Sequence, residues 1–252
     1  MINWTQMTND PLDSSVRTQV LNYLKDIRSP LPGNNYNQYL ADTCHGKRVL
    51  DIGVCEHTQE RMVSKGWKHR IVVENAEYCL GLDIDKPLTN ELKAAGYNVV
   101  CCDATSDTDL GERFDVIHIG DVIEHVDSPV KLIKFAARHL RENGIILVRT
   151  PAAYCFGYVD LIYKNTTDLS NLEHMYYVLP IHMIEISRRA GVEMNCYRTL
   201  TRSGLTRSGI VAALGHIKNF KFRHAWAELF APPEIYTTIY VYELSKTKES
   251  VI

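Results

Sequence analysis

The chain has 252 residues with a formal net charge of −2, and 45% of its residues are apolar. This length and apolar content predict one large α/β domain, or one domain with an elaboration, and the near-neutral charge excludes a general attraction to nucleic acid or membranes. Seven cysteines without a paired spacing, no apolar leader and no apolar run of about 20 residues predict a cytoplasmic protein with reduced thiols and no membrane span.

The first predicted element is a helix over residues 13–28. Its apolar residues recur at helical spacing and form one stripe, and Asp13, Ser14 or Ser15 can cap its first turn. The stretch 29–35 ends the helix, because its prolines and its glycine disfavour further helix. We therefore expect residues 1–45 to form an N-terminal helical cap that packs over the main domain, residues 46–252.

From residue 48 onward, apolar runs alternate with helical patterns. This alternation predicts βαβ units, and hence an α/β, Rossmann-like fold with a mostly parallel sheet and helices on both faces. The stretches at about 150–180 and 200–232 lie outside the pattern and are expected to build the substrate side. The predicted strands are 48–52, 78–83, 98–102, 114–119, 145–149, 193–200 and 235–244, and the helices are 88–95, 128–140 and 180–190.

Three of the predicted strands end at an aspartate: Asp51, Asp83 and Asp103. The carboxyl ends of parallel strands lie at one edge of an open α/β sheet, where ligands bind. A carboxylate at Asp83 can accept both hydroxyls of a ribose, and Asp103 with Ala104 lies where an adenine amino group would be recognised. Gly53, just after the first strand, lets the backbone approach a ligand closely.

These runs resemble the class I S-adenosylmethionine-dependent methyltransferases over about residues 45–150. The resemblance implies S-adenosylmethionine as the cofactor and a seven-stranded sheet whose last strand is reversed. The matching stretches are Val49–Gly53, Gly81–Asp85, Cys102–Ala104, Phe114–Val126 and Leu140–Leu147, with Glu173–Pro180 similar to a substrate-side segment of the family.

The resemblance also assigns residues to parts of the cofactor. It implies methionine contacts from the first loop, a ribose contact from Asp83 and an adenine contact from Asp103. The segment after the fourth strand would lie beside both cofactor and substrate. The cofactor-binding residues expected in this way are Asp51, Gly53, Glu56, Asp83, Asp103, Ala104, Ile119 and Gly120.

The first loop departs from the family pattern. Cys55 and His57 stand where the family usually has its second and third glycines. Asp83 follows Asp51 by 32 residues, which is longer than usual, and Trp67–Arg70 lies in the extra length. A methyltransferase subgroup has a similar loop and insertion, so we interpret the loop as a variant. Glu56 would then hold the amino group of the cofactor, or else only favour the first turn of a helix.

Methyl transfer to an oxygen needs alignment of the reactants and a base for the hydroxyl proton. The candidates are His174, His125, Asp121 and His118, and His174 is preferred because it lies in the substrate-side segment. Histidine suits this role because its ordinary pKa is close to neutral pH. His118 falls inside a predicted strand and is expected to be a packed core residue.

A metal site is an alternative use of the same residues. If residues 121–125 begin a helix, Asp121, Glu124 and His125 share a face and could join His174 in a two-carboxylate, two-imidazole site. The stretch is similar to the metal-binding motif of small-RNA 2′-O-methyltransferases and of some ubiquinone-pathway O-methyltransferases. It is also similar to many family members without a metal, so we expect no resident ion and keep Mg²⁺ as the alternative.

The leading hypothesis is O-methylation of a small polar molecule. A stretch without acidic residues, 194–227, carries six arginines and lysines and suggests an anionic acceptor, such as a sugar- or nucleotide-linked compound. A metal-dependent RNA 2′-O-methyltransferase is the second hypothesis, although nucleic acid is not the expected partner. The third is a non-catalytic binding module with a degenerate cofactor loop. The acceptor and the oligomeric state are not specified by these patterns.

Overall fold

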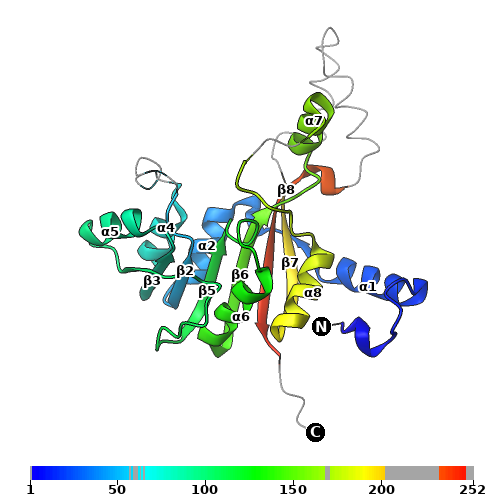
Figure 1. Ribbon diagram of the computed structural model, residues 1–252, viewed down its shortest axis with the longest axis horizontal. Helices are drawn as coiled ribbons and strands as arrows, with labels where there is room; N and C mark the ends of the chain where they lie inside the picture. Colours follow the sequence, from blue (N-terminus) through cyan, green and yellow to red (C-terminus); the bar gives the residue numbers. More distant parts are fainter. Residues whose placement is uncertain are drawn as a thin grey trace.

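The computed structural model describes residues 2–56, 58, 62, 64, 66–167, 171–201 and 233–247. Within these residues, one eight-stranded sheet has the order β1-β7-β8-β6-β5-β2-β3-β4 (Figure 1). Neighbouring strands are parallel except where β8 pairs, because β8 runs antiparallel to both β6 and β7. The α/β, Rossmann-like prediction and its reversed last strand are confirmed, with eight strands in place of the seven expected.

Seven of these eight strands fall on stretches predicted to be strands. The bounds of β2 and β3 match the prediction at every residue, because each is a short apolar run that stops at a turn. Strand β6 is longer than predicted, since Leu140 already pairs with Phe114 before a register shift. The strands are β1 (Arg28–Pro30), β2 (Arg48–Ile52), β3 (Tyr78–Asp83), β4 (Val99–Cys101), β5 (Phe114–Gly120), β6 (Leu140–Pro151), β7 (Val192–Thr201) and β8 (Thr237–Lys246).

The four predicted helices are confirmed, and three further helices of eight to ten residues were not predicted. Asp13 is the N-cap of the first helix, where its carboxylate accepts hydrogen bonds from the backbone N–H groups of Ser15 and Val16. The α-helices are α1 (Ser14–Asp26), α2 (Tyr36–Cys44), α4 (Lys68–Asn75), α5 (Lys86–Ala94), α6 (Pro129–His139), α7 (Phe156–Asn165) and α8 (Pro180–Ala190).

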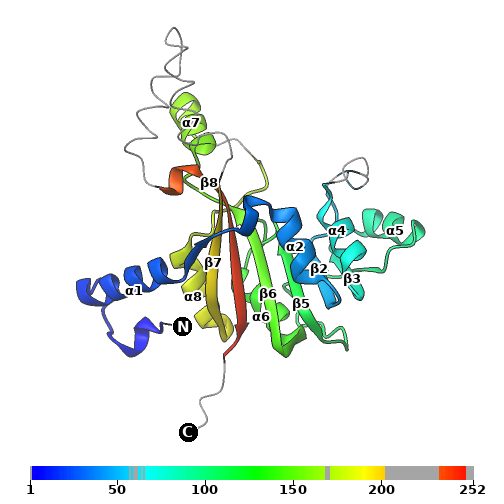
Figure 2. The same ribbon diagram turned by 180° about the vertical axis from the view of Figure 1, so that it is seen from behind.

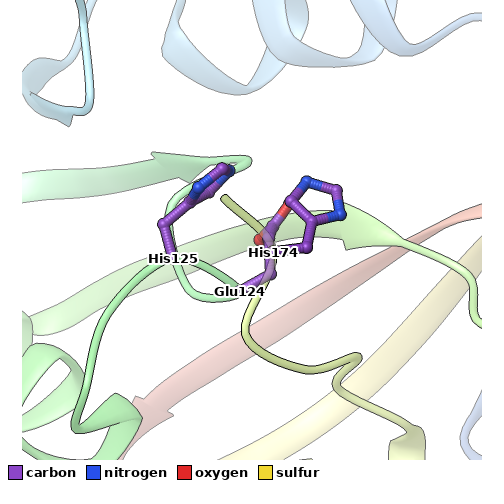
Figure 3. A group of neighbouring side chains, drawn as sticks. All are labelled: Glu124, His125 and His174. Carbon is purple, nitrogen blue, oxygen red and sulfur yellow. The ribbon is translucent and has the colours of Figure 1, made fainter. Parts of the chain in front are cut away.

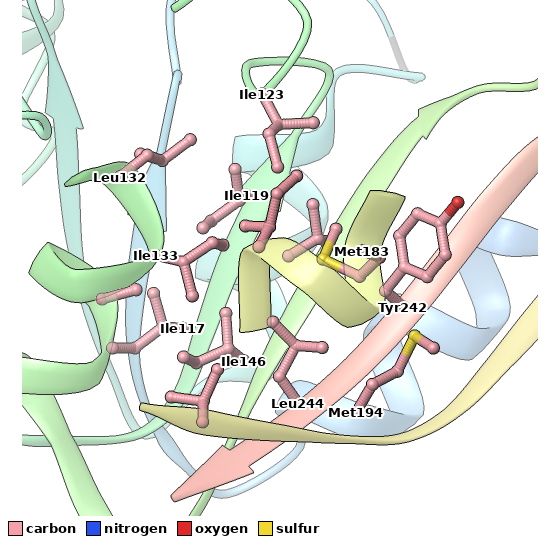
Figure 4. Close-up of a cluster of buried hydrophobic side chains, with 14 of the residues drawn as sticks. Ile117, Ile119, Ile123, Leu132, Ile133, Ile146, Met183, Met194, Tyr242 and Leu244 are labelled. Carbon is pink, nitrogen blue, oxygen red and sulfur yellow. The ribbon is translucent and has the colours of Figure 1, made fainter. Parts of the chain in front are cut away.

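Helices cover both faces of the sheet, so most of its strands are buried on both sides. Helices α1, α6 and α8 lie on one face, where Leu132 and Met183 pack against Ile117, Ile146 and neighbouring residues (Figure 4). Helices α2 and α4 lie on the other face, as Figure 2 shows from behind, and pack there against alternate residues of the same strands. This period-two division of each strand fixes its register.

The N-terminal segment is more than the helical cap that the sequence predicts. Residues Arg28–Pro30 form β1, which pairs in parallel with Tyr197–Thr199 of β7 and ends the sheet on that side. Pro30 lacks an N–H donor, which is tolerated at a sheet edge. The next residue, Leu31, donates its N–H to the carbonyl of Thr199 at 3.0 Å. The breaker-rich stretch 29–35 therefore contains an edge strand that local propensity hides.

Helix α7 stands away from the sheet, next to the end of β6 from which its chain segment leaves (Figure 1). It belongs to the stretch 150–180 that lacked the strand–helix alternation. The second such stretch, 200–232, lies almost entirely outside the described residues. Among the helices that the structure describes, none has the length and apolar character needed to cross a membrane. All seven cysteines are free thiols.

The core cluster on the α6 side makes a direct stability prediction. Leu132 is fully buried in this cluster, so Leu132→Ala should remove about 2–5 kcal/mol from the free energy of unfolding by leaving a cavity. Urea unfolding followed by circular dichroism measures this loss. The same substitution at Leu12, whose side chain is 74% exposed, should change the free energy of unfolding by about 0.5 kcal/mol or less. Equal losses in the two variants would contradict the burial pattern.

Candidate functional site

The carboxyl ends of β2, β3 and β5 open into one cavity of about 660 Å³. The end of β6 and the segment Asn171–His174 complete its wall, so parts of the chain far apart in sequence meet here. This is the sheet edge to which the three terminal aspartates pointed. The predicted site residues that line the cavity are Asp51, Gly53, Glu56, Asp83, Asp103, Ala104, Gly120, Asp121, Glu124, His125 and His174.

Ile119 does not follow this pattern, because its side chain is fully buried in the hydrophobic core. Its neighbour Gly120 lines the cavity instead. In a strand, successive side chains point to opposite faces, and the strand end presents backbone to the site. The structure therefore places the side chain of Ile119, one of the residues expected to bind the cofactor, in the core.

The carboxylate of Asp83 is oriented by backbone groups. Its Oδ2 accepts a hydrogen bond from the N–H of Cys55 at 2.8 Å, and its Oδ1 accepts one from the N–H of Asp85 at 3.0 Å. Because each carboxylate oxygen has two lone pairs, both can still accept hydrogen bonds from a ligand in the cavity. The contact with Cys55 needs only a backbone N–H, so a residue other than glycine fits there.

The thiol of Cys55 is not activated in this position. Burial raises its pKa well above the usual value, and the nearby charge of Asp83 raises it further. The thiol therefore stays protonated at neutral pH, which argues against a nucleophilic role.

Gly53 is required by both its conformation and its surroundings. Its φ of +82° lies in the left-handed region, and a Cβ atom there would stand 2.1 Å from Cγ2 of Val122. The loops after β2 and β5 therefore touch at this glycine. Any other residue would be strained at this φ and would displace the side chain of Val122.

The residues expected to lie beside the adenine, Asp103 and Ala104, form a compact turn after β4. One oxygen of Asp103, Oδ1, accepts hydrogen bonds from the backbone N–H and the hydroxyl of Thr105, at 2.7 and 2.8 Å. Ala104 is nearly fully buried, although it also contributes to the cavity wall. The position of both residues at the sheet edge agrees with the order of motifs in the sequence.

Asp51 is held by two histidines. Its Oδ1 lies 2.6 Å from Nδ1 of His118, and its Oδ2 lies 2.8 Å from Nδ1 of His69. All three side chains are almost completely buried. On the far side of His118, its Nε2 lies 2.7 Å from the hydroxyl of Tyr36 in α2. The expectation that His118 is a core residue is confirmed, whereas the part played by His69 was not foreseen.

This network decides the charge state of Asp51. Burial on its own would raise the pKa of Asp51, but the imidazole of His118, and then that of His69, lower this pKa well below its usual range. Asp51 is therefore an anion whose oxygens already accept hydrogen bonds from the protein. Any direct contact with the methionine part of a cofactor has to use the remaining lone pairs.

The extra length before β3 positions one of these histidines. Trp67 is buried, its indole Nε1 donates to the carbonyl of Val54 at 2.8 Å, and its ring packs against that of His69. Trp67 thus secures the first loop, while His69 reaches Asp51 from the first turn of α4. The spacing of Trp67 and His69 was the sequence signal for this arrangement, and it could be interpreted only once α4 was placed.

Glu124, His125 and His174 converge in the cavity (Figure 3). Their ligand atoms all lie within 4.8 Å of one another, and the two imidazole rings are perpendicular with centroids 4.8 Å apart. Thr150 donates its hydroxyl to Oε2 of Glu124 at 3.1 Å. Burial raises the pKa of Glu124 to about 7, although the hydrogen bonds that its carboxylate accepts oppose the shift.

Asp121 does not join this group. Residues 121–125 form a turn, in which the N–H of His125 bonds to the carbonyl of Val122, so the helix that a four-residue metal site would require does not form there. Asp121 has a φ of +54° and its carboxylate forms an ion pair with Arg149 of β6. The turn therefore directs Asp121 toward Arg149, and three of the four candidate ligands come together.

The donor set of these three residues suits a divalent cation. Two imidazole nitrogens and a carboxylate oxygen are ordinary ligands for such ions. In addition, Oε1 of Glu124 is buried and makes no hydrogen bond within the described residues, so a cation could satisfy it. The residues thus fit a metal ion, just as Gly53, Asp83 and Asp103 fit a ligand with a ribose and an adenine.

Two sequence relatives are O-methyltransferases. The chain is 33% identical over 98 residues to the ubiquinone biosynthesis O-methyltransferase of Rickettsia typhi, a match covering 34% of this chain and 40% of that protein. It is 23% identical over 167 residues to the enzyme of the same name from Marinobacter nauticus, covering 64% of this chain and 70% of that protein. The chain thus spans less than half of the first relative.

A comparison with solved structures supports the same fold. A SAM-dependent methyltransferase from Archaeoglobus fulgidus superimposes with a TM-score of 0.54 and 16% sequence identity, covering 83% of this chain and 90% of that one. The family model described as a methyltransferase domain matches residues 23–197, from within α1 to β7. The chain therefore belongs to the methyltransferase domain family and has the fold of S-adenosylmethionine-dependent methyltransferases.

Proposed function

We propose that the protein transfers a methyl group from S-adenosylmethionine to a hydroxyl of a small polar acceptor. The observation that carries this proposal is that His125 and His174 lie in the same cavity as Asp83. A carboxylate at the ribose position serves cofactor binding, and an imidazole can serve as the base that oxygen methylation needs. The names of the two sequence relatives support an oxygen acceptor.

S-adenosylmethionine, when bound, supplies a methyl group activated by its sulfonium. In this proposal Asp83 accepts hydrogen bonds from the ribose hydroxyls, while Asp103 and Ala104 lie beside the adenine. Glu56, which lines the same cavity, is the carboxylate for the amino group. The backbone at Gly53 and Gly120 leaves room for close approach.

The remaining task of the chain is to hold an acceptor hydroxyl in line and to take its proton. His174 is the proposed base, with His125 beside it at a ring-centroid distance of 4.8 Å. Asp121 was the third candidate for this role. Its carboxylate is engaged by the ion pair with Arg149 and is therefore less available to take a proton from an acceptor.

The first functional prediction concerns Asp83, at the end of β3. Asp83→Asn removes the charge that accepts ribose hydroxyls but keeps one acceptor oxygen, which can retain the hydrogen bond from the N–H of Cys55 while the one from Asp85 is lost. Isothermal titration should show S-adenosylhomocysteine binding weakened about 10- to 100-fold, as expected for the loss of charged hydrogen bonds. Asp127→Asn, at an exposed position, should bind like the unaltered protein. Unchanged affinity in Asp83→Asn would refute the cofactor site.

The second functional prediction concerns the proposed base, His174. His174→Gln keeps a hydrogen-bonding side chain of similar size but cannot take a proton at neutral pH. The rate of S-adenosylhomocysteine formation, measured over a panel of catechols, phenols and sugars, should fall about 10²- to 10⁴-fold. His182→Gln, at an exposed histidine of α8, is the matched control and should keep the rate. A His174→Gln variant as active as the control would exclude His174 as the base.

The convergence of Glu124, His125 and His174 supports a second candidate, a metal-dependent methyltransferase, of which RNA 2′-hydroxyl methylation is one form. In that case the three side chains would hold a divalent ion, which would supply a positive charge beside the acceptor oxygen. Asp121 is not needed as a ligand, because it is paired with Arg149.

Chelation separates the two candidates. Under the leading proposal, EDTA treatment followed by gel filtration leaves methyl transfer to small acceptors unchanged, and added RNA is not methylated. Loss of activity on chelation, restored by Mg²⁺ or Mn²⁺ and abolished by Glu124→Gln, would instead establish the metal-dependent enzyme. RNA binding would then weaken steeply with salt concentration.

A further inference from the structure

Lys68 and Arg149 both lie in the wall between two neighbouring cavities. Lys68 begins α4 and Arg149 lies near the end of β6, and both line the main cavity. Both also line a neighbouring hollow of about 520 Å³ between Gly33–Asn37 and Ile239. None of the residues expected to bind the cofactor lines that hollow. The pair therefore lies between the proposed cofactor site and a space beside it.

Lys68 has little to balance its charge. Its Nζ donates one hydrogen bond, to the carbonyl of Gly66 at 2.8 Å, and the side chain is half-buried. Within the described residues, no carboxylate lies at ion-pair distance from it. Burial lowers the pKa of Lys68, the charge of Arg149 lowers it further, and Glu56 acts in the opposite direction.

Arg149 is partly satisfied. One end of its guanidinium is paired with Asp121, and the group lies over the ring of Tyr36 with 5.1 Å to the ring centroid. Its Nε is buried and makes no hydrogen bond within the described part of the chain. Since a guanidinium has five N–H donors, most of its capacity toward an anion remains available.

An anion bound in addition to Asp121 would reduce the repulsion between Lys68 and Arg149. Two like charges in partly buried surroundings repel each other, and within the described residues only Arg149 has a carboxylate, that of Asp121, at ion-pair distance. A planar guanidinium and a flexible ammonium can together bind the oxygens of a carboxylate or a phosphate. The start of α4, whose N-cap Trp67 provides no side-chain hydrogen bond, adds the positive end of a helix dipole.

We propose that Lys68 and Arg149 bind a carboxylate or phosphate of the methyl acceptor, part of which occupies the hollow beside Gly33–Asn37. This inference rests on the proposed methyltransferase function and gives its acceptor a chemical class. The carboxylate of the cofactor is the competing occupant. The acceptor is favoured as the occupant because none of the residues assigned to the cofactor lines the hollow.

The first arm of the test measures anion binding directly. Isothermal titration of S-adenosylhomocysteine-loaded protein with inorganic phosphate and with benzoate should show binding, whereas neutral benzyl alcohol should bind much more weakly. Lys68→Met should weaken both anions about tenfold, as expected for a lost charged hydrogen bond, and Lys68→Arg should restore them. Lys131→Met, at an exposed lysine of α6, is the control and should bind like the unaltered protein.

The second arm identifies the source of the anion. S-adenosylhomocysteine carries the amino acid part of the cofactor, whereas 5′-methylthioadenosine lacks it. If the acceptor occupies the site, Lys68→Met binds both compounds with unchanged affinity. A loss confined to S-adenosylhomocysteine would overturn the proposal, because Lys68 would then hold the cofactor carboxylate. Phosphate and benzoate that fail to bind, or that bind Lys68→Met unchanged, would also overturn it.

The two proposals fail in different ways. If S-adenosylhomocysteine binds and depends on Asp83 while phosphate and benzoate do not bind, only the anion site is refuted. If S-adenosylhomocysteine does not bind to the unaltered protein, the methyltransferase proposal itself fails, whatever the anions do.

Discussion

The buried charge of Asp51 organises the centre of the molecule. Asp51 lies on the innermost cavity-forming strand and is satisfied by His118 from β5 and His69 from α4. His69 fits there because residue 81 is glycine; a Cβ at Gly81 would stand 2.7 Å from the imidazole. Removing one partner of a buried ion typically lowers the free energy of unfolding by about 3–5 kcal/mol. The contacts of Asp51 therefore fix the positions of β2, β3, β5 and α4 relative to one another.

Much of the fold could be predicted because its strands are short apolar runs with clear ends, as in β2 and β3. What escaped prediction depends on contacts between distant segments. Pro30 favours a chain break in isolation, yet β1 forms because β7 offers its carbonyl and N–H groups. Helix α4 is only eight residues long and owes its position to the packing of Trp67 and Val72 rather than to its own propensity.

Part of the candidate site could also be predicted from the sequence. Asp83, Asp103 and Gly53 follow from the rule that ligands bind at the carboxyl ends of parallel strands. Local spacing misled where the backbone was irregular: Asp121 at positive φ turns toward Arg149, and Ile119 points into the core. The proximity of Lys68 and Arg149, on which the proposed anion site rests, could not be predicted from the sequence, because it is created by α4 and β6 alone. The basic residues beyond Thr201 on which the anionic acceptor was first based lie outside the described residues, and Arg198 is paired with Glu243.

The pairing of β1 with β7 also has a consequence for the order of folding. Ser29 and its partner Arg198 are separated by 169 positions in the chain. During synthesis from the N-terminus, the partner of β1 emerges only after β2 to β6 have been made. The first segment of the sheet in sequence is therefore among the last to be completed. Until then, the edge that β1 will cover and the hollow next to it remain unformed, so assembly of the site depends on a late, long-range closure.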